Sequence, residues 1–216
     1  MTGHGRKPKE VVYMPSKDTY RATVGSQVLD LPVVDLSSTL TIALLITVDH
    51  GVHFAETAGI ELAAELNDLN VDIIVSVATM GIPLAIETTR ALGLDDYVIL
   101  HKTQKIHLAD GEWEAVKSIT TDADQRLLFD RARISAVQGK RVAIVDDVIS
   151  TGGSIVAALR LVRKVGGEPV ALGCLVTEGD AWKTALGADA ALVRPLGSIP
   201  LFHRDDLGNL VNEPIN

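Results

Sequence analysis

The segment from Val142 to Ser154 constrains the fold more than any other part of this chain. It reads Val-Ala-Ile-Val-Asp-Asp-Val-Ile-Ser-Thr-Gly-Gly-Ser. The apolar run at 142–145 predicts a strand buried on both faces, which is typical of a parallel sheet. Such a strand delivers Asp146 and Asp147 to the carboxyl edge of the sheet, where open α/β folds bind their ligands.

The turn after the two acids predicts a phosphate site. Residues 150–154 combine hydroxyl groups, glycine backbone N–H groups and the expected start of a helix, and these suit a phosphate dianion. With the acids beside it, the segment predicts a ligand that carries both a phosphate and hydroxyls, with or without a metal ion. The alternative is an ordinary buried strand with an Asp-Asp turn and a Ser/Thr helix cap. Paired acids followed by Gly-Gly favour the ligand site.

The block from Val145 to Ser154 resembles the signature of type I phosphoribosyltransferases, which bind 5-phospho-α-D-ribosyl-1-pyrophosphate (PRPP). The resemblance implies that Asp146 and Asp147 hold the ribose hydroxyls, act in catalysis and approach Mg²⁺ indirectly or through the substrate. It implies that the 5-phosphate is held by the residues that follow, namely Ser150, Thr151, Gly152, Gly153 and Ser154.

A second strand, turn and helix start lies at residues 75–83, where Pro83 fits the first turn of a helix. Alone, this is a weak signal that an ordinary turn also explains. The resemblance implies a pyrophosphate-binding loop here, often with a cis peptide bond. The contact residues would be Ala78, Thr79, Met80 and Gly81.

The polar stretch at residues 102–116 is predicted to be a lid, since a long polar loop inside a compact domain is often one. The resemblance implies that Lys102 and Lys105 meet the pyrophosphate and that Lys102 takes part in catalysis. A solvated basic loop is the alternative, and for Lys105 it is equally favoured. Purine-using members commonly have arginine where this chain has His101, and a neutral imidazole cannot replace a bidentate guanidinium.

Nucleobase recognition is the least constrained part of the prediction. The candidate contacts are Glu178 and Trp182, which follow the strand expected at 170–176. Trp182 could stack on a purine, and core packing is its alternative. Asp147 is the candidate by position for a general base.

Composition narrows the class of protein. The chain has 216 residues, is 47% hydrophobic and carries a net charge of −8. The acidic balance argues against a general nucleic-acid surface, because backbone binding needs clustered cations. One cysteine, Cys174, excludes a disulfide within the chain and is predicted to be a buried structural thiol. The apolar run at 40–48 is too short to span a bilayer, and no signal peptide is seen, so a cytoplasmic location without membrane contact is expected.

The expected fold is α/β, with a central, largely parallel sheet flanked by helices and a small N-terminal hood subdomain. Alternating strands and helices support it. The predicted organisation is an arm and hood at 1–50, a PRPP-binding core at 51–195 with its lid near 102–116, and a C-terminal tail at 196–216 that completes the hood. Expected strands lie at 71–77, 97–100, 116–120, 141–145, 170–176 and 190–193. Expected helices lie at 52–69, 83–92, 122–136, 153–165 and 182–186.

The leading functional hypothesis is transfer of the phosphoribosyl group from PRPP to a purine base in purine salvage, with adenine favoured and xanthine or guanine possible. A homodimer is expected by resemblance. One alternative is an orotate or other pyrimidine phosphoribosyltransferase. Another is a non-catalytic PRPP-sensing regulator, which would need a recognition helix or a basic face.

Overall fold

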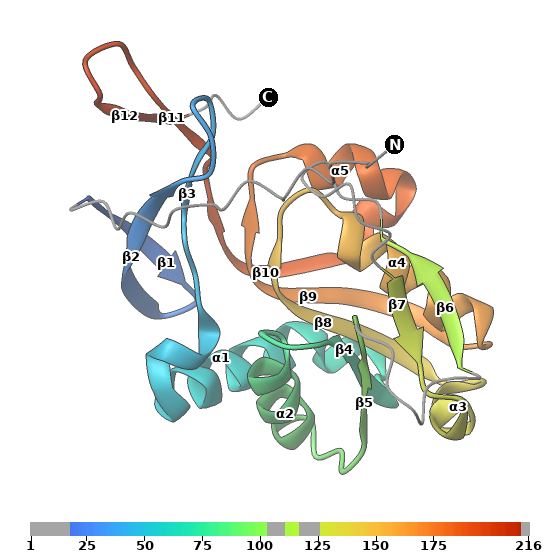
Figure 1. Ribbon diagram of the computed structural model, residues 1–216. Coiled ribbons are helices and arrows are strands. Elements are labelled where there is room, and N and C mark those ends of the chain that lie inside the picture. Colours follow the sequence, from blue (N-terminus) through green and yellow to red (C-terminus); the bar gives the residue numbers. More distant parts are fainter. Residues whose placement is uncertain (1–17, 103–110, 117–125, 213–216) are drawn as a thin grey trace, which may run out of the picture.

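The computed structural model describes residues 18–102, 111–116 and 126–212. A five-stranded parallel sheet forms the core, with the order β10-β9-β8-β4-β5 (Figure 1). Because β4 comes first in the chain and has β5 on one side and β8 on the other, the winding direction reverses between β4 and β8. This position is the topological switch point of the sheet. The strands are β4 (Ile73–Val77), β5 (Tyr97–Leu100), β8 (Arg141–Ile149), β9 (Glu168–Glu178) and β10 (Val193–Ile199).

Two hydrophobic clusters, one on each face of the sheet, form the core. Side chains alternate along the strands, so Ile74 packs into one cluster and Val75 into the other. Helices α1 (Gly51–Leu66) and α2 (Ile82–Ala91) cover the first face, and α4 (Gly153–Lys164) and α5 (Ala181–Leu186) cover the second. None of the helices in the described ranges is both long and apolar enough to cross a bilayer.

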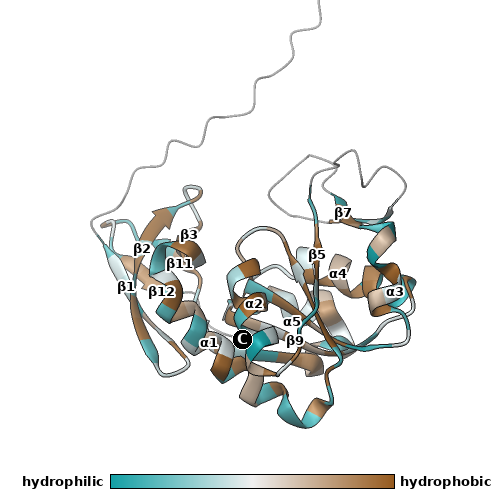
Figure 2. Ribbon diagram, turned by 90° about the horizontal axis from the view of Figure 1, so that it is seen from below, coloured by the Kyte–Doolittle hydropathy of each residue, from teal (hydrophilic) through white to brown (hydrophobic). Residues whose placement is uncertain are grey.

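A second, antiparallel sheet forms the hood and stands to one side of the core (Figures 1 and 2). Its strands come from both ends of the chain, in the order β1-β2-β3-β11-β12. Its hydrophobic face belongs to the same cluster as α1 and α2. The strands are β1 (Thr19–Val24), β2 (Gln27–Asp35), β3 (Thr41–Ala43), β11 (Phe202–Arg204) and β12 (Leu210–Asn212).

Ion pairs and hydrogen bonds hold the hood together and fasten it to the core. The Arg204 guanidinium on β11 contacts both carboxylate oxygens of Asp35 at 3.0 Å and one of Asp18 at 3.2 Å. At the other end of the hood, the backbone N–H of Gly25 donates to the Leu196 carbonyl at 2.8 Å. The N–H of Ser26 donates to Glu61 Oε1 on α1 at 3.0 Å. The hood is therefore docked on the core through β10 and α1.

The prediction of one continuous helix at 122–136 is wrong. Residues 117–125 lie outside the described part, and the chain then forms β7 (Arg126–Phe129), a 3-10 turn η4 (Arg131–Arg133) and the short helix α3 (Ile134–Val137). Strand β7 pairs antiparallel with β6 (Glu112–Ala115). The Arg126 guanidinium lies 4.3 Å from the centroid of the Trp113 ring on β6. Pairing with a distant segment thus overrides the local helical pattern.

Other boundaries shift by smaller amounts. The strand expected at 116–120 lies outside the described residues except for Val116, while β6 ends at Ala115 and sets Glu112 opposite Phe129. The strand expected at 190–193 begins only at Val193, since a 3-10 turn, η5 (Gly187–Leu192), follows α5. Two further 3-10 turns, η1 (Thr47–His50) and η2 (Asn67–Leu69), flank α1. The remaining expected helices and strands of the core are present.

Candidate active site

Both turns singled out in the sequence lie at the switch point of the sheet. Strand β4 runs into residues 78–81 and then α2, while β8 runs through the two acids into residues 150–154 and then α4. Strands β4 and β8 are paired in register, with Ser76 opposite Val145. Their carboxyl ends therefore meet at one edge, where α/β sheets bind ligands.

The acid pair lies at this edge, with one member buried and the other partly exposed. Asp146 is 7% exposed, and its Oδ1 accepts the backbone N–H of Asp147 at 3.0 Å. Burial raises the pKa of the Asp146 carboxyl well above its ordinary value, and the neighbouring Asp147 raises it further. The charge of Lys102 opposes these effects on the Asp146 pKa. The site thus holds a desolvated acid that hydroxyl groups or a cation would stabilise as a carboxylate.

The turn at residues 78–81 is packed tightly against the acid pair. A Cβ atom on Gly81 would lie 2.6 Å from Ser76 Oγ and 2.8 Å from Asp146 Oδ1. The Ala78–Thr79 peptide bond is cis, where the resemblance implied one. The N–H of Ala78 donates to the Leu100 carbonyl at 2.9 Å, which joins this turn to the end of β5. Thr79 is exposed, and Met80 is partly buried.

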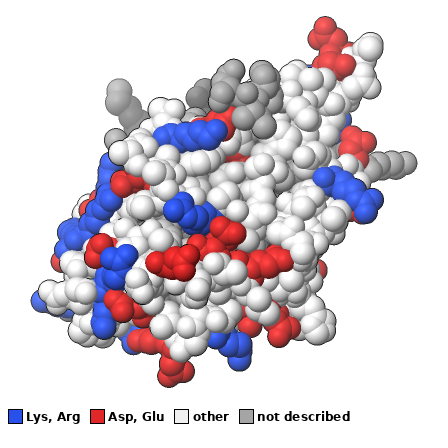
Figure 3. Space-filling model, turned by 180° about the vertical axis from the view of Figure 1, so that it is seen from behind, with Lys and Arg blue, Asp and Glu red and all other residues white. Residues whose placement is uncertain are grey.

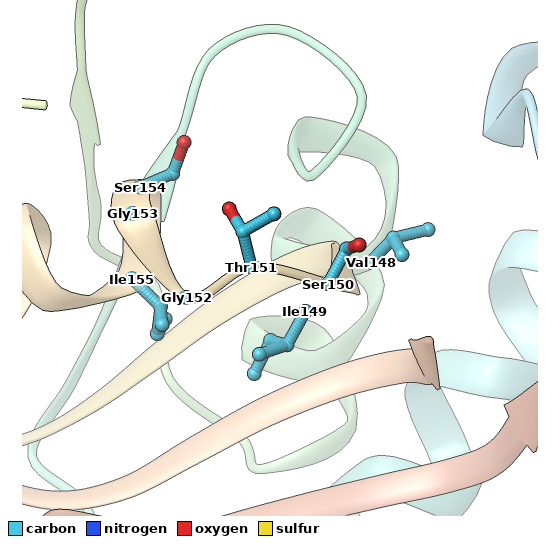
Figure 4. A pocket seen from close by; sticks show the side chains of 8 residues that line it. All are labelled: Val148, Ile149, Ser150, Thr151, Gly152, Gly153, Ser154 and Ile155. Atoms are coloured by element: carbon cyan, nitrogen blue, oxygen red, sulfur yellow. The ribbon is translucent and has the colours of Figure 1, made fainter. Parts of the chain in front are cut away.

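The turn after β8 forms an open cavity of about 120 Å³. Figure 4 shows the Thr151 and Ser154 hydroxyls on one side of the loop, with Ser150 at the strand end beside Val148. Gly152 has a φ of 84°, a left-handed conformation that favours glycine. The cavity is lined by all five residues predicted to hold the 5-phosphate, together with Val148, Ile149 and Ile155.

The lid residues are placed only in part. Lys102 is exposed beyond the end of β5, and its charge acts on Asp146. The backbone of His101 exchanges two hydrogen bonds with Leu128, at 3.0 and 2.8 Å, which ties the residue before the predicted lid to β7. Lys105 and most of the predicted lid lie outside the described residues.

The two candidate base contacts differ in their surroundings. Glu178 ends β9 at the carboxyl edge and is 8% exposed. Burial raises the pKa of its carboxyl, while a hydrogen bond with Ser150 lowers it. Trp182 belongs to the hydrophobic cluster on the α4 face, and its Nε1–H donates to the Gly179 carbonyl at 3.0 Å. Its burial in this cluster favours core packing, the alternative given for this residue, and its Cα and Cβ lie close to Gly152.

Two relations in the site were not anticipated from the sequence: the burial of Ser76 beside Gly81, and the position of Cys174 opposite Asp146. Ser76 is fully buried beside Gly81, and its Oγ has no hydrogen-bond partner among the described residues. Cys174 is opposite Asp146 in the sheet register, and burial raises the pKa of its thiol, which confirms a buried structural cysteine. A partial signal for the first of these relations was present in the sequence, because Ser76 lies in the strand Ile73–Val77, which is buried along its whole length.

The chain belongs to the phosphoribosyl transferase domain family, whose model matches residues 53–194. The matched range begins in α1 and includes both turns, the acid pair and Glu178. It leaves out most of the hood, which is built from residues before and after it.

Individual relatives agree on the family and differ in the base they are named for. The chain is 34% identical over 113 residues to a hypoxanthine/guanine phosphoribosyltransferase of Methanococcus voltae, covering 52% of this chain and 56% of that protein. It is 27% identical over 128 residues to an orotate phosphoribosyltransferase of Caldanaerobacter subterraneus subsp. tengcongensis, covering 59% of this chain and 56% of that protein. It thus spans little more than half the length of either relative.

The fold matches that of solved type I phosphoribosyltransferases. The adenine phosphoribosyltransferase of Thermoanaerobacter pseudethanolicus superposes with a TM-score of 0.57 at 22% identity, covering 74% of this chain and 88% of that one. At this identity the likeness establishes the α/β core with its hood, as the sequence predicted.

Proposed function

We propose that this protein transfers the 5-phosphoribosyl group from PRPP to a nucleobase, giving a nucleoside monophosphate and pyrophosphate. The observation that carries the proposal is the meeting of the acid pair, with Asp146 buried, and a hydroxyl-lined cavity at the switch point of the sheet. The cavity can bind a phosphate, and the acid pair beside it can accept hydrogen bonds from hydroxyl groups of the same ligand. Membership in the phosphoribosyl transferase domain family supports the same assignment.

In this proposal each part of the site has a separate role. Residues 150–154 hold the 5-phosphate, and Asp146 and Asp147 hold the ribose hydroxyls. The turn at 78–81 holds the pyrophosphate with backbone N–H groups at the start of α2. Lys102, and Lys105 beyond the described residues, add positive charge there. As the C1–O bond to pyrophosphate loosens, the carboxylates stabilise positive charge that develops on the sugar.

A magnesium ion fits this site if the substrate provides most of its ligands. No group of three or more His, Cys, Asp or Glu side chains is placed to hold a metal within the described ranges. Asp146 and Asp147 offer carboxylate oxygens, which Mg²⁺ prefers, and Mg²⁺ commonly takes the rest from phosphates and water. When bound, the ion would neutralise charge on the leaving pyrophosphate.

The proposed acceptor is a purine, with adenine first and guanine, hypoxanthine and xanthine next. The hypoxanthine/guanine name of one relative supports a purine. Orotate is the second candidate, because the other relative is named for it. Homodimer formation stays a prediction, which light scattering after size exclusion would check.

The test is pyrophosphate release from PRPP and Mg²⁺ with each of adenine, guanine, hypoxanthine, xanthine, orotate and uracil. Release that depends on one base supports the transferase and names its substrate. PRPP binding by calorimetry without release for any base would instead favour the PRPP-sensing regulator. Failure to bind PRPP would overturn both.

The regulator would also need a surface for nucleic acid. On the face shown in Figure 3, basic and acidic side chains are interspersed. Among the described residues of the whole molecule, several cations are paired, including Arg163 with Asp189 at 2.7 Å and Lys164 with Glu112 at 2.9 Å. This pattern favours the transferase, since backbone binding requires clustered unpaired cations.

A further inference from the structure

Glu178 and Ser150 lie side by side between the cavity after β8 and the face of the sheet that carries the hood. The register of β8 and β9 sets Ile149 opposite Thr177, so the next residues, Ser150 and Glu178, are cross-strand neighbours. Their side chains are hydrogen-bonded. Ser150 also lines the phosphate cavity (Figure 4). One hydroxyl thus connects a buried carboxyl with the loop proposed to hold the sugar phosphate.

Strand geometry places Glu178 on the face of the sheet that carries the hood. On β10, Gly197 is opposite Val176 and Ile199 is opposite Glu178. Val176 and Ile199 both belong to the cluster that contains hood residues. Because paired residues of neighbouring strands project to the same face, Glu178 lies on the face of its partner Ile199. Its side chain is therefore on the side where a base between core and hood would enter.

The other charged groups around the end of β9 have partners or proposed roles of their own, which leaves Glu178 as the candidate to accept a proton. On β8, Asp146 and Asp147 are assigned to the ribose hydroxyls. At the start of α5, Asp180 forms an ion pair with Lys183 at 2.5 Å. On the β10 side, Ile199 and Leu201 are apolar, and Leu201 packs against Gly179. Burial among apolar neighbours is the main reason that the pKa of Glu178 is raised.

We propose that Glu178, held in place by Ser150, accepts the ring N–H proton that the nucleobase loses on becoming bonded to the sugar. The inference rests on the proposed phosphoribosyl transfer. In this step the ring nitrogen forms a bond to C1 with its electron pair, and its proton passes to the Glu178 carboxylate. The C1–O bond breaks, and its electron pair leaves with pyrophosphate. Glu178 takes the role for which Asp147 was the candidate by position.

The chemistry suits a buried carboxyl in both directions of the reaction. A general base works best when its pKa lies near the working pH, and burial moves Glu178 toward that range. In the reverse direction, the protonated acid returns the proton to the departing base. The forward rate should therefore fall at low pH, where Glu178 is protonated, and the reverse rate should fall at high pH, where it is ionised.

The experiment compares the full-length wild type with Glu178→Gln, Ser150→Ala and Glu168→Gln, using the base that the wild type accepts. The kcat for pyrophosphate release and for the reverse reaction is followed from about pH 5 to 9. Glu168 is the matched control, because it lies on the same strand at the opposite end and is exposed, paired with Arg141 at 3.1 Å. Glu168→Gln should behave as the wild type.

Glu178→Gln should lower kcat by about 10²- to 10⁴-fold and remove the fall at low pH. Ser150→Ala should keep this fall and move it to higher pH, because the Ser150 hydrogen bond lowers the pKa of Glu178. A merely structural role would not move the pH profile. Thermal unfolding checks the fold, and Glu178→Gln should be at least as stable as the wild type because it removes a buried charge.

Wild-type kcat in Glu178→Gln, or a loss confined to the KM for PRPP, would overturn the inference and leave the proposed function standing. A wild type that releases no pyrophosphate with any base would instead overturn the proposed function. In that case Glu178 has no proton to accept, and the inference is overturned with it.

Discussion

The two strand-to-helix turns at the site share a pattern in the sequence and differ in physical character. The turn after β4 is pressed against the acid pair, and Gly81 leaves no room for a side chain. The turn after β8 is open, lined by hydroxyls and held in shape by a left-handed glycine. The first turn positions other groups by close contact, whereas the second offers its own groups to a ligand. Similar motifs can thus contribute to one site in different ways.

The largest effect is expected where both turns meet, at the acid pair. Asp146→Asn with Asp147→Asn should lower turnover by about 10³-fold or more, because the carboxylates are proposed to hold the sugar and stabilise its charge. Calorimetric titration with PRPP should show lost binding. Unchanged turnover would remove the acid pair from the site.

The same change should stabilise the protein without ligand. Burial raises the pKa of Asp146 in the folded state, so the folded form binds more protons than the unfolded form between the two pKa values. Stability therefore falls as pH rises through the folded pKa, and asparagine removes this penalty. The gain in Tm should be larger at high pH than at low pH, at about 2–4 °C per kcal/mol for a chain of this size.

Gly152→Ala tests the shape of the open turn. A side chain at a φ of 84° costs about 1–2 kcal/mol, and its Cβ would lie 2.8 Å from the Ala185 Cβ. We expect lower stability in denaturant unfolding and a raised KM for PRPP. The control is Gly139→Ala, which has a φ of 72° and nothing within 4 Å. It should lose stability and keep its KM.

Gly81→Ala tests the packed turn, where steric crowding, and not backbone strain, is expected to lower the stability. Gly81 has a φ of −72°, which any residue adopts. Overpacking should cost about 1–3 kcal/mol of stability and lower kcat by displacing Asp146. Adding Ser76→Ala removes the closest contact, at 2.6 Å, and leaves the one with Asp146. The double variant should recover stability more than kcat, and equal recovery of both would argue against displacement of the acid.

The smallest effects come from single hydroxyls. Thr151→Val should raise the KM for PRPP about tenfold, since one hydrogen bond contributes about 1 kcal/mol and more when the acceptor is charged. Thr79→Val is the same change in the packed turn. It should have a smaller effect, because that turn is expected to bind through backbone N–H groups. If steady-state kinetics gave a larger rise in the KM for PRPP in Thr79→Val than in Thr151→Val, the turn after β4 would be the one that binds through its side chains.

Sequence reasoning located the parts of the fold that depend on local pattern. Apolar runs ending in small residues predicted β4, β8 and the helices after them to within a few residues, because buried parallel strands and helix starts have strong local signals. The family resemblance supplied the hood and the cis bond at Ala78–Thr79.

What failed depends on distant partners. Strand β7 exists because it pairs with β6 and because Arg126 covers Trp113, and neither contact can be seen in residues 122–136 alone. The burial of Trp182 depends on the cluster around α4 and α5, which the residues near 182 do not reveal by themselves. The crowding of Gly81 against Ser76 and Asp146 joins residues 70 positions apart and needs the sheet register to be known.

The ion pair between Arg204 and Asp35 also bears on the order in which parts of the protein fold during synthesis. The two residues are separated by 169 positions. Strands β1 to β3 emerge from the ribosome early, yet β11 cannot pair with β3 until almost the entire core has been made. Until then, the early hood strands expose an open edge, which is a site for wrong pairing with other chains. The hood sheet can therefore be completed only after the strands of the core have been synthesised.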